Sequence, residues 1–123
     1  MTTQNPVGWF EIYVQDMDRA KAFYEAVLGT RLGRLGGDLE MWAFPQAMGA
    51  GGTSGALVKA PGVPSGGNST LVYFACDDVA TEAARVAGAG GKLAREKMSI
   101  GQYGFIALAH DTEGNLFGMH SLK

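Results

Sequence analysis

The chain has few of the residues that build cross-links and metal centres. It contains one cysteine and two histidines among its 123 residues. A single cysteine excludes an internal disulfide, and no Cys/His spacing suggests structural zinc. Charged residues make up 18%, the net charge is −2, and no segment concentrates lysine and arginine. We therefore expect neither nucleic acid nor an anionic membrane as a partner.

Long apolar runs are also missing. No run approaches the length needed to cross a bilayer, and the start "MTTQNPVGW" lacks the basic and apolar regions of a secretion signal. We expect a cytoplasmic protein. The hydrophobic share of 46% is enough for the core of one domain over residues 1–123, and the 19 glycines predict many turns between short elements.

The chain contains an internal repeat. The stretch "FEIYVQDMDRAKAFYEAVLG" has alternating apolar residues, acidic residues, a helical pattern and a glycine, and the same order returns in "VYFACDDVATEAARVAGAGG". Aligning Asp16 with Asp78 gives an offset of 62 (78 − 16), half the chain. Few identities survive, so the shared pattern carries the evidence. The repeat predicts module one over about 7–59, a Gly/Pro-rich linker over about 60–68 and module two over about 69–121.

Each module is predicted to contain a strand, a helix and three further strands. Asp16 or Asp18 can cap the first helix, whose apolar stripe ends at Gly29, a residue suited to a left-handed stop. The stripe consists of Met17, Ala20, Tyr24, Val27 and Leu28. The predicted strands cover 7–14, 31–35, 39–44 and 54–59, then 69–76, 92–97, 103–109 and 115–121, with a second helix over 78–88.

Two segments carry a family resemblance. "YVQDMDRAKAFYEAVLG" and the late turn "DTEGNLFG" resemble the vicinal oxygen chelate superfamily, which includes lactoylglutathione lyase, extradiol dioxygenases and bleomycin or fosfomycin resistance proteins. The resemblance implies an α+β fold in which two βαβββ modules curl a mixed sheet around a cavity, often in a homodimer. A dimeric ferredoxin-like domain is the more distant alternative.

The resemblance also implies a divalent metal held from four strands, but the matching positions carry unsuitable residues. The first lies seven residues before Asp16, at Trp9, and the repeat puts its partner at Leu71 (9 + 62). The others fall at Gly118 and at Ala56 (118 − 62). None offers an oxygen or nitrogen ligand, because the indole N–H only donates. We therefore expect no cofactor and doubt the usual metal-dependent chemistry.

Strand alternation predicts a different polar cluster. With Phe10, Ile12 and Val14 towards the helix, Glu11 points to the cavity, and the same alternation aims Tyr73 and His120 inward. Glu11 and His120 are candidate acid–base residues, or could hold a metal together with waters. A structural partner for Glu11 and a purely structural His120 are the alternatives.

Aromatic residues suggest the ligand. Five of them are predicted to line an apolar pocket, namely Trp9, Tyr13, Trp42, Phe44 and Tyr73. We expect a binder of a small apolar or aromatic molecule, with Glu11 and His120 fixing its polar end. The alternative is a lyase-like or isomerase-like enzyme that uses these two residues. The alternative for each single aromatic residue is an ordinary core or dimer contact.

Overall fold

The structure, a computed structural model, describes residues 5–47 and 51–123. Module one contains, in order, β1 (Phe10–Tyr13), α1 (Met17–Leu28), β2 (Gly33–Leu35), β3 (Glu40–Ala43) and β4 (Gly55–Lys59). Module two contains β5 (Tyr73–Ala75), α2 (Val79–Arg85), β6 (Lys92–Ser99), the 3-10 turn η1 (Gly101–Tyr103), β7 (Phe105–His110) and β8 (Leu116–Ser121).

The strands form two four-stranded mixed sheets with the same topology. Their orders are β1-β4-β3-β2 and β5-β8-β7-β6. In each sheet the first strand pairs in parallel with the last strand of its own module, and the other pairs are antiparallel. The predicted α+β fold of two βαβββ modules is therefore confirmed.

The first helix forms where the sequence predicts it. Asp16 is the N-cap, and its side chain accepts a hydrogen bond from the backbone N–H of Arg19. Gly29 ends the helix in the left-handed conformation, at φ 65°. Because its apolar residues recur every three or four positions, the helix buries one face, made by Met17, Ala20, Phe23, Tyr24 and Val27.

The second helix is shorter than predicted. Asp78 caps it by accepting a hydrogen bond from the backbone N–H of Ala80, but the helix ends at Arg85 rather than near residue 88. The following sequence "VAGAGG" has three glycines, which weaken a helix, and the backbone there forms turns.

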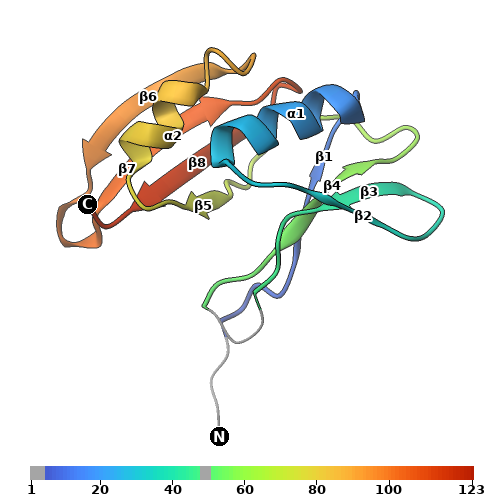
Figure 1. Cartoon of the computed structure of the whole chain (residues 1–123), viewed down its shortest axis with the longest axis horizontal. Helices are drawn as coiled ribbons and strands as arrows, with labels where there is room; N and C mark the ends of the chain where they lie inside the picture. Colours follow the sequence, from blue (N-terminus) through green and yellow to red (C-terminus); the bar gives the residue numbers. More distant parts are fainter. Residues whose placement is uncertain (1–4, 48–50) are drawn as a thin grey trace, which may run out of the picture.

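Both helices lie on the same side of the two sheets (Figure 1). The core fills the space between these layers, and an aromatic cluster joins the modules within it. The Tyr24 ring lies 5.4 Å from that of Phe117 and 5.8 Å from that of Phe74, measured between centroids. One residue of α1 thus packs against two strands of module two.

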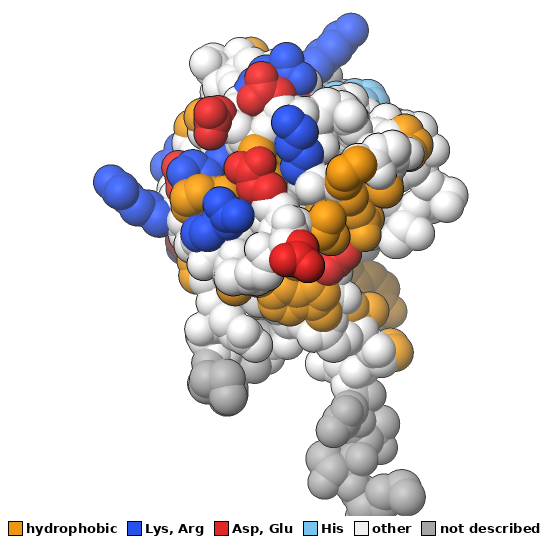
Figure 2. Space-filling model, turned by 90° about the vertical axis from the view of Figure 1, so that its right-hand side faces the viewer, with side chains coloured by type: hydrophobic (Ala, Val, Ile, Leu, Met, Phe, Trp, Pro, Cys, Tyr) orange, Lys and Arg blue, Asp and Glu red, His pale blue; other side chains and the backbone are white. Residues whose placement is uncertain are grey.

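The surface shows no single dominant charge on the face that Figure 2 presents, where acidic and basic side chains are interspersed. Within residues 5–47 and 51–123, neither helix has the length and apolar character required to cross a membrane.

Candidate functional site

A polar cluster lies on the face of β1 that points away from the helices. Tyr13 donates its hydroxyl to Glu11 Oε1 at 2.8 Å, and the Trp9 indole N–H donates to Glu11 Oε2 at 3.4 Å. Ile12 and Val14 are buried on the opposite face, so the predicted alternation holds along this strand. The hydrogen bond to Glu11 is the main cause that raises the pKa of Tyr13, ahead of burial and the Glu11 charge.

The carboxylate of Glu11 is therefore held by its own strand neighbours. It is exposed to solvent and accepts from both Trp9 and Tyr13, so no arginine is needed to balance it. Two directed donors fix the orientation of the acid while leaving it accessible, as a residue that contacts a ligand requires.

The positions implied for metal ligands do not fit a divalent cation. Ala56 pairs with Glu11 across β1 and β4, and Gly118 pairs with Tyr73 across β5 and β8. A Cβ atom added at Gly118 would overlap the Tyr73 ring, so an aromatic side chain covers the place of a ligand there. Within the described parts of the chain, no group of three or more His, Cys, Asp or Glu side chains could hold a metal ion.

Module two places the other two members of the predicted cluster. Tyr73 lies over Gly118 with 45% of its surface exposed, and His120 pairs with Ala75 along β8. His120 Nε2 is 2.6 Å from the carbonyl oxygen of Tyr103. Because a carbonyl only accepts, Nε2 carries a proton, and in the neutral ring Nδ1 is left as an acceptor.

The predicted cluster is not connected through hydrogen bonds. Among the described residues, none joins Glu11 to Tyr73 or His120. The three side chains lie on the faces of their sheets that point away from the helices, but Glu11 belongs to module one and the others to module two.

The five predicted aromatic residues do not share one face. Trp9, Tyr13 and Tyr73 lie on faces opposite the helices, whereas Trp42 packs beneath α1, with the Lys21 ammonium 3.6 Å from its ring centroid. Phe44 is 7% exposed and packs 5.2 Å from Phe74, centroid to centroid, in the core. Sequence alternation did not show which face of β3 points to the cavity, so the prediction for Trp42 and Phe44 rested on their aromatic character alone.

A pocket of about 420 Å³ opens beside this cluster, between β1, β8 and the linker. We call it the linker pocket. Its walls are mostly apolar, and its volume is within the range of small-molecule sites. It is lined by Phe10, Glu11, Ile12, Tyr13, Tyr24, Pro64, Ser65, Gly66, Asn68, Thr70, Val72, Asn115, Leu116 and Phe117. The linker residues were missed by sequence reasoning, because a Pro/Gly-rich composition predicts a connection but not what it covers.

The turn "DTEGN" supports one wall of the linker pocket. Asn115 donates to the Tyr13 carbonyl at 3.0 Å and accepts from the backbone N–H of Gly66 at 2.6 Å. Ser65 donates to the Glu113 carbonyl at 2.8 Å. This turn thus ties the linker to β1 and positions the side chains around the pocket.

Comparisons with known proteins agree with this architecture. The model of the Glyoxalase/Bleomycin resistance protein/Dioxygenase superfamily matches residues 7–119. A Mycobacterium bovis protein named "Putative glyoxylase CFP32" is 32% identical over 111 residues, which cover 90% of this chain and 42% of the relative. The chain thus spans less than half the length of this curated relative.

Solved structures show the same fold. TnmS3, an antibiotic binding protein from Streptomyces sp. CB03234, is 26% identical, with a TM-score of 0.73 and 100% of both chains covered. A glyoxalase/bleomycin resistance protein from the same organism is 27% identical, with a TM-score of 0.72, covering 93% of this chain and 98% of its own.

Proposed function

Since the chain belongs to the glyoxalase/bleomycin resistance protein/dioxygenase superfamily, we propose that it binds a small apolar or aromatic molecule in the linker pocket. The observation that carries the proposal is this mostly apolar pocket of about 420 Å³, with the oriented carboxylate of Glu11 among its walls. The likeness to an antibiotic binding protein over the full length of both chains supports the same class of function.

The bound molecule would contact three kinds of group. Tyr13 offers an aromatic ring at the pocket wall. Trp9 lies near it, because both side chains donate to the Glu11 carboxylate, and so extends the aromatic surface beyond the pocket. Glu11 would accept a hydrogen bond from a hydroxyl or amine of the ligand. His120 does not line the pocket, and its Nδ1 would accept a further bond only from a ligand long enough to extend beyond the pocket to β8.

A thermal-shift and fluorescence titration against a panel of aromatic drugs tests this proposal. We expect some compounds to stabilise the protein and to change its tryptophan emission, and we expect Glu11→Gln to weaken the binding of those that bear a donor group by about tenfold. Glu96→Gln, at an exposed position on β6, is the matched control and should bind normally. If no compound binds, or if Glu11→Gln and Glu96→Gln behave alike, this use of the pocket is excluded. Mass spectrometry of molecules that copurify would identify a natural ligand.

Acid–base catalysis by Glu11 and His120 is the second candidate function. The free Nδ1 of a neutral His120 and the accessible carboxylate of Glu11 can both accept protons, and the Mycobacterium bovis relative is named a glyoxylase. Loss of turnover in both Glu11→Gln and His120→Ala would support it, whereas turnover surviving both would exclude it. Metal analysis of the protein after addition of nickel, zinc, manganese or iron tests the atypical metal site.

A homodimer is the third part of the proposal. Trp9 is 39% exposed and Tyr73 is 45% exposed, both on faces opposite the helices, and a second copy would cover such large apolar side chains. We expect light scattering on a sizing column to give twice the mass of the chain. A monomer mass at micromolar concentration would contradict this assembly.

A further inference from the structure

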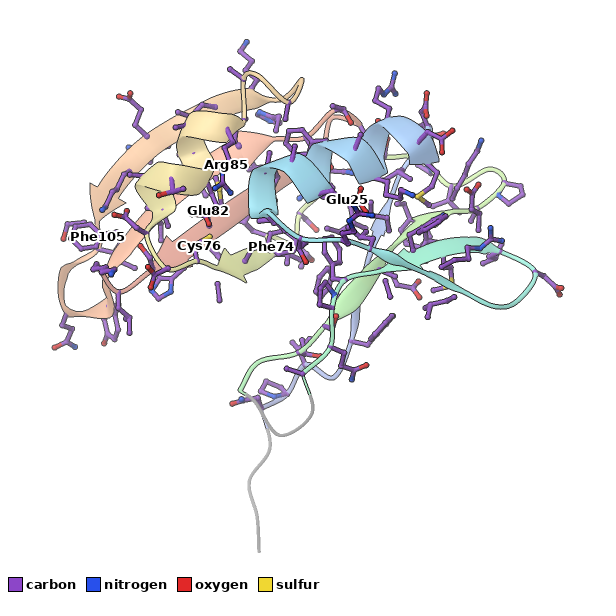
Figure 3. All side chains as sticks on the ribbon, in the orientation of Figure 1. Glu25, Phe74, Cys76, Glu82, Arg85 and Phe105 are labelled. Carbon is purple, nitrogen blue, oxygen red and sulfur yellow. The ribbon has the colours of Figure 1, made fainter. Side chains whose placement is uncertain are left out.

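A second pocket, of about 230 Å³, lies at the other end of the junction between the modules. We call it the Glu82 pocket. Residues of β5 and α2 form one side, and the chain around Phe44 and Ser54 forms the other. Figure 3 shows Cys76 and Glu82 close together beneath α2, with Phe74 beside them.

Glu82 places a carboxylate where the repeat has an apolar residue. Its equivalent in α1 is Ala20 (82 − 62), which is fully buried, and the equivalent of Cys76 is Val14 (76 − 62), also buried. Glu82 Oε1 is shielded from solvent and has no hydrogen-bond partner among the described residues. A carboxylate oxygen in such surroundings is unfavourable unless a donor reaches it.

Nearby protein groups supply Glu82 with only a weak donor. Arg85, one turn further along α2, uses its Nη1 to donate to the Val27 carbonyl at 3.1 Å. The ion pairs found in the described residues are Arg19–Glu113, Lys97–Asp78 and Lys123–Asp77, and none includes Glu82. Burial, followed by the negative charge of Glu82 and a hydrogen bond to that carboxylate, raises the pKa of the Cys76 thiol to about 12, so this group stays neutral and offers Glu82 only a weak donor.

Aromatic rings form much of the remaining wall. The rings of Phe10, Phe44 and Phe74 all line the pocket and pack against one another, with centroids 5.2 to 5.9 Å apart. Aromatic faces attract cations, and a carboxylate beside them adds a charge-assisted hydrogen bond. The space is smaller than a typical drug-sized site, which limits the ligand to a small molecule.

From this combination we propose that the Glu82 pocket binds a small organic ammonium ion, with its charged nitrogen on Glu82 and its apolar part against the three phenylalanine rings. The carboxylate can turn about its terminal torsion, which has a broad energy minimum, to direct an oxygen towards the ligand. This site lies apart from Glu11 and goes beyond the function proposed for the linker pocket.

Titration of the ¹⁵N-labelled protein with benzylammonium chloride, followed by NMR, tests this site. We expect saturable shifts of the backbone amides of Ser54, Ala75 and Glu82, and tighter binding of benzylammonium than of benzyl alcohol, which has a similar shape without the charge. Glu82→Gln should weaken benzylammonium by at least about tenfold and leave benzyl alcohol unchanged. Glu96→Gln, which removes one negative charge elsewhere, should bind benzylammonium as the wild type does.

Three results would overturn the site. They are equal affinity for benzylammonium and benzyl alcohol, undiminished binding by Glu82→Gln, and shifts confined to residues around the linker pocket. Glu11→Gln should not change the affinity for benzylammonium, so failure of this proposal can be told from failure of the first. The spectra of each variant also report whether it is folded.

Discussion

The two ends of the junction between the modules are related by the repeat but satisfy their polar groups differently. At one end, the turn Asp111–Asn115 packs against the connection between β1 and α1, and Glu113 accepts hydrogen bonds from the backbone N–H groups of Gln15 and Asp16 at 2.9 and 2.8 Å. At the other end, Glu82 has an oxygen without a partner beside a pocket. The first end is tied by hydrogen bonds across the modules, whereas the second leaves an acidic oxygen without a partner.

The two ends also differ in sequence at the positions of these side chains. The repeat places Gly51 where module two has Glu113 (113 − 62) and Thr53 where it has Asn115 (115 − 62). Gly51 has no side chain to offer the start of α2, while Glu113 also binds Arg19, with Nε to Oε2 at 2.7 Å. The two ends therefore differ at the repeat positions that carry the polar side chains of the turn Asp111–Asn115.

Glu113→Gln should have the largest effect on stability. The Glu113 side chain is fully buried, and hydrogen bonds from Arg19, Asp16 and Gln15 outweigh the cost of burial and lower its pKa from 4.5 to about 2. Half of the Arg19 side chain is exposed, and solvent weakens its ion pair with Glu113. We therefore expect Glu113→Gln to lower the free energy of unfolding at pH 7 by about 2–3 kcal/mol, less than the pKa shift alone would give. Urea denaturation measures it, with exposed Glu96→Gln as a control that should change little.

The stability lost in Glu113→Gln should also depend on pH. A carboxyl group whose pKa is lowered by folding stabilises the protein above its unfolded pKa, near 4.5, and loses this contribution as the pH falls through about 2. The difference between wild type and Glu113→Gln should therefore be greatest near neutral pH and shrink between pH 5 and pH 2. A difference that does not vary with pH would show that the ion pair is not its source.

Tyr24→Phe tests a second contact of the turn Asp111–Asn115. The Tyr24 hydroxyl is buried and donates to Asp111 Oδ2 at 2.6 Å, and Asp111 keeps three other donors, from Glu113 and Asn115. We expect a loss of about 1–2 kcal/mol, because one buried hydrogen bond is removed without leaving its acceptor unpaired. Urea denaturation measures the loss, and Tyr103→Phe, at a residue that is 66% exposed, should be neutral in the same experiment.

Most of the fold was predictable because local signals and the repeat agree. Asp16, Asp78 and Gly29 mark helix ends through rules that act within a few residues, and alternation fixed the faces of β1 and β8. The family resemblance supplied the topology, which periodicity alone does not determine.

The candidate site was less predictable because it depends on contacts between distant segments. The sequence assigned Glu11 to the right face but could not show that Trp9 and Tyr13 would hold it, nor that the linker would form a pocket wall. The turn "DTEGN" stood out as a family motif, yet its bonds to Gln15 and Asp16 span 97 to 98 residues. No sequence pattern indicated a site at Glu82, because an acidic residue in a short amphipathic helix is expected to be exposed to solvent.

Glu82→Gln should have the smallest effect of the three on stability, although it is the same chemical change as Glu113→Gln. Removing a charge whose neighbouring donor is only the weak thiol of Cys76 should leave the free energy of unfolding unchanged or raise it by up to about 1 kcal/mol in the absence of a ligand. The two variants, unfolded in urea side by side, compare the two ends of the junction directly. A loss greater than about 1 kcal/mol in Glu82→Gln would mean that the carboxylate has a stabilising partner within the protein. Glu82 would then stabilise the junction between the modules, as Glu113 does, rather than bind a ligand.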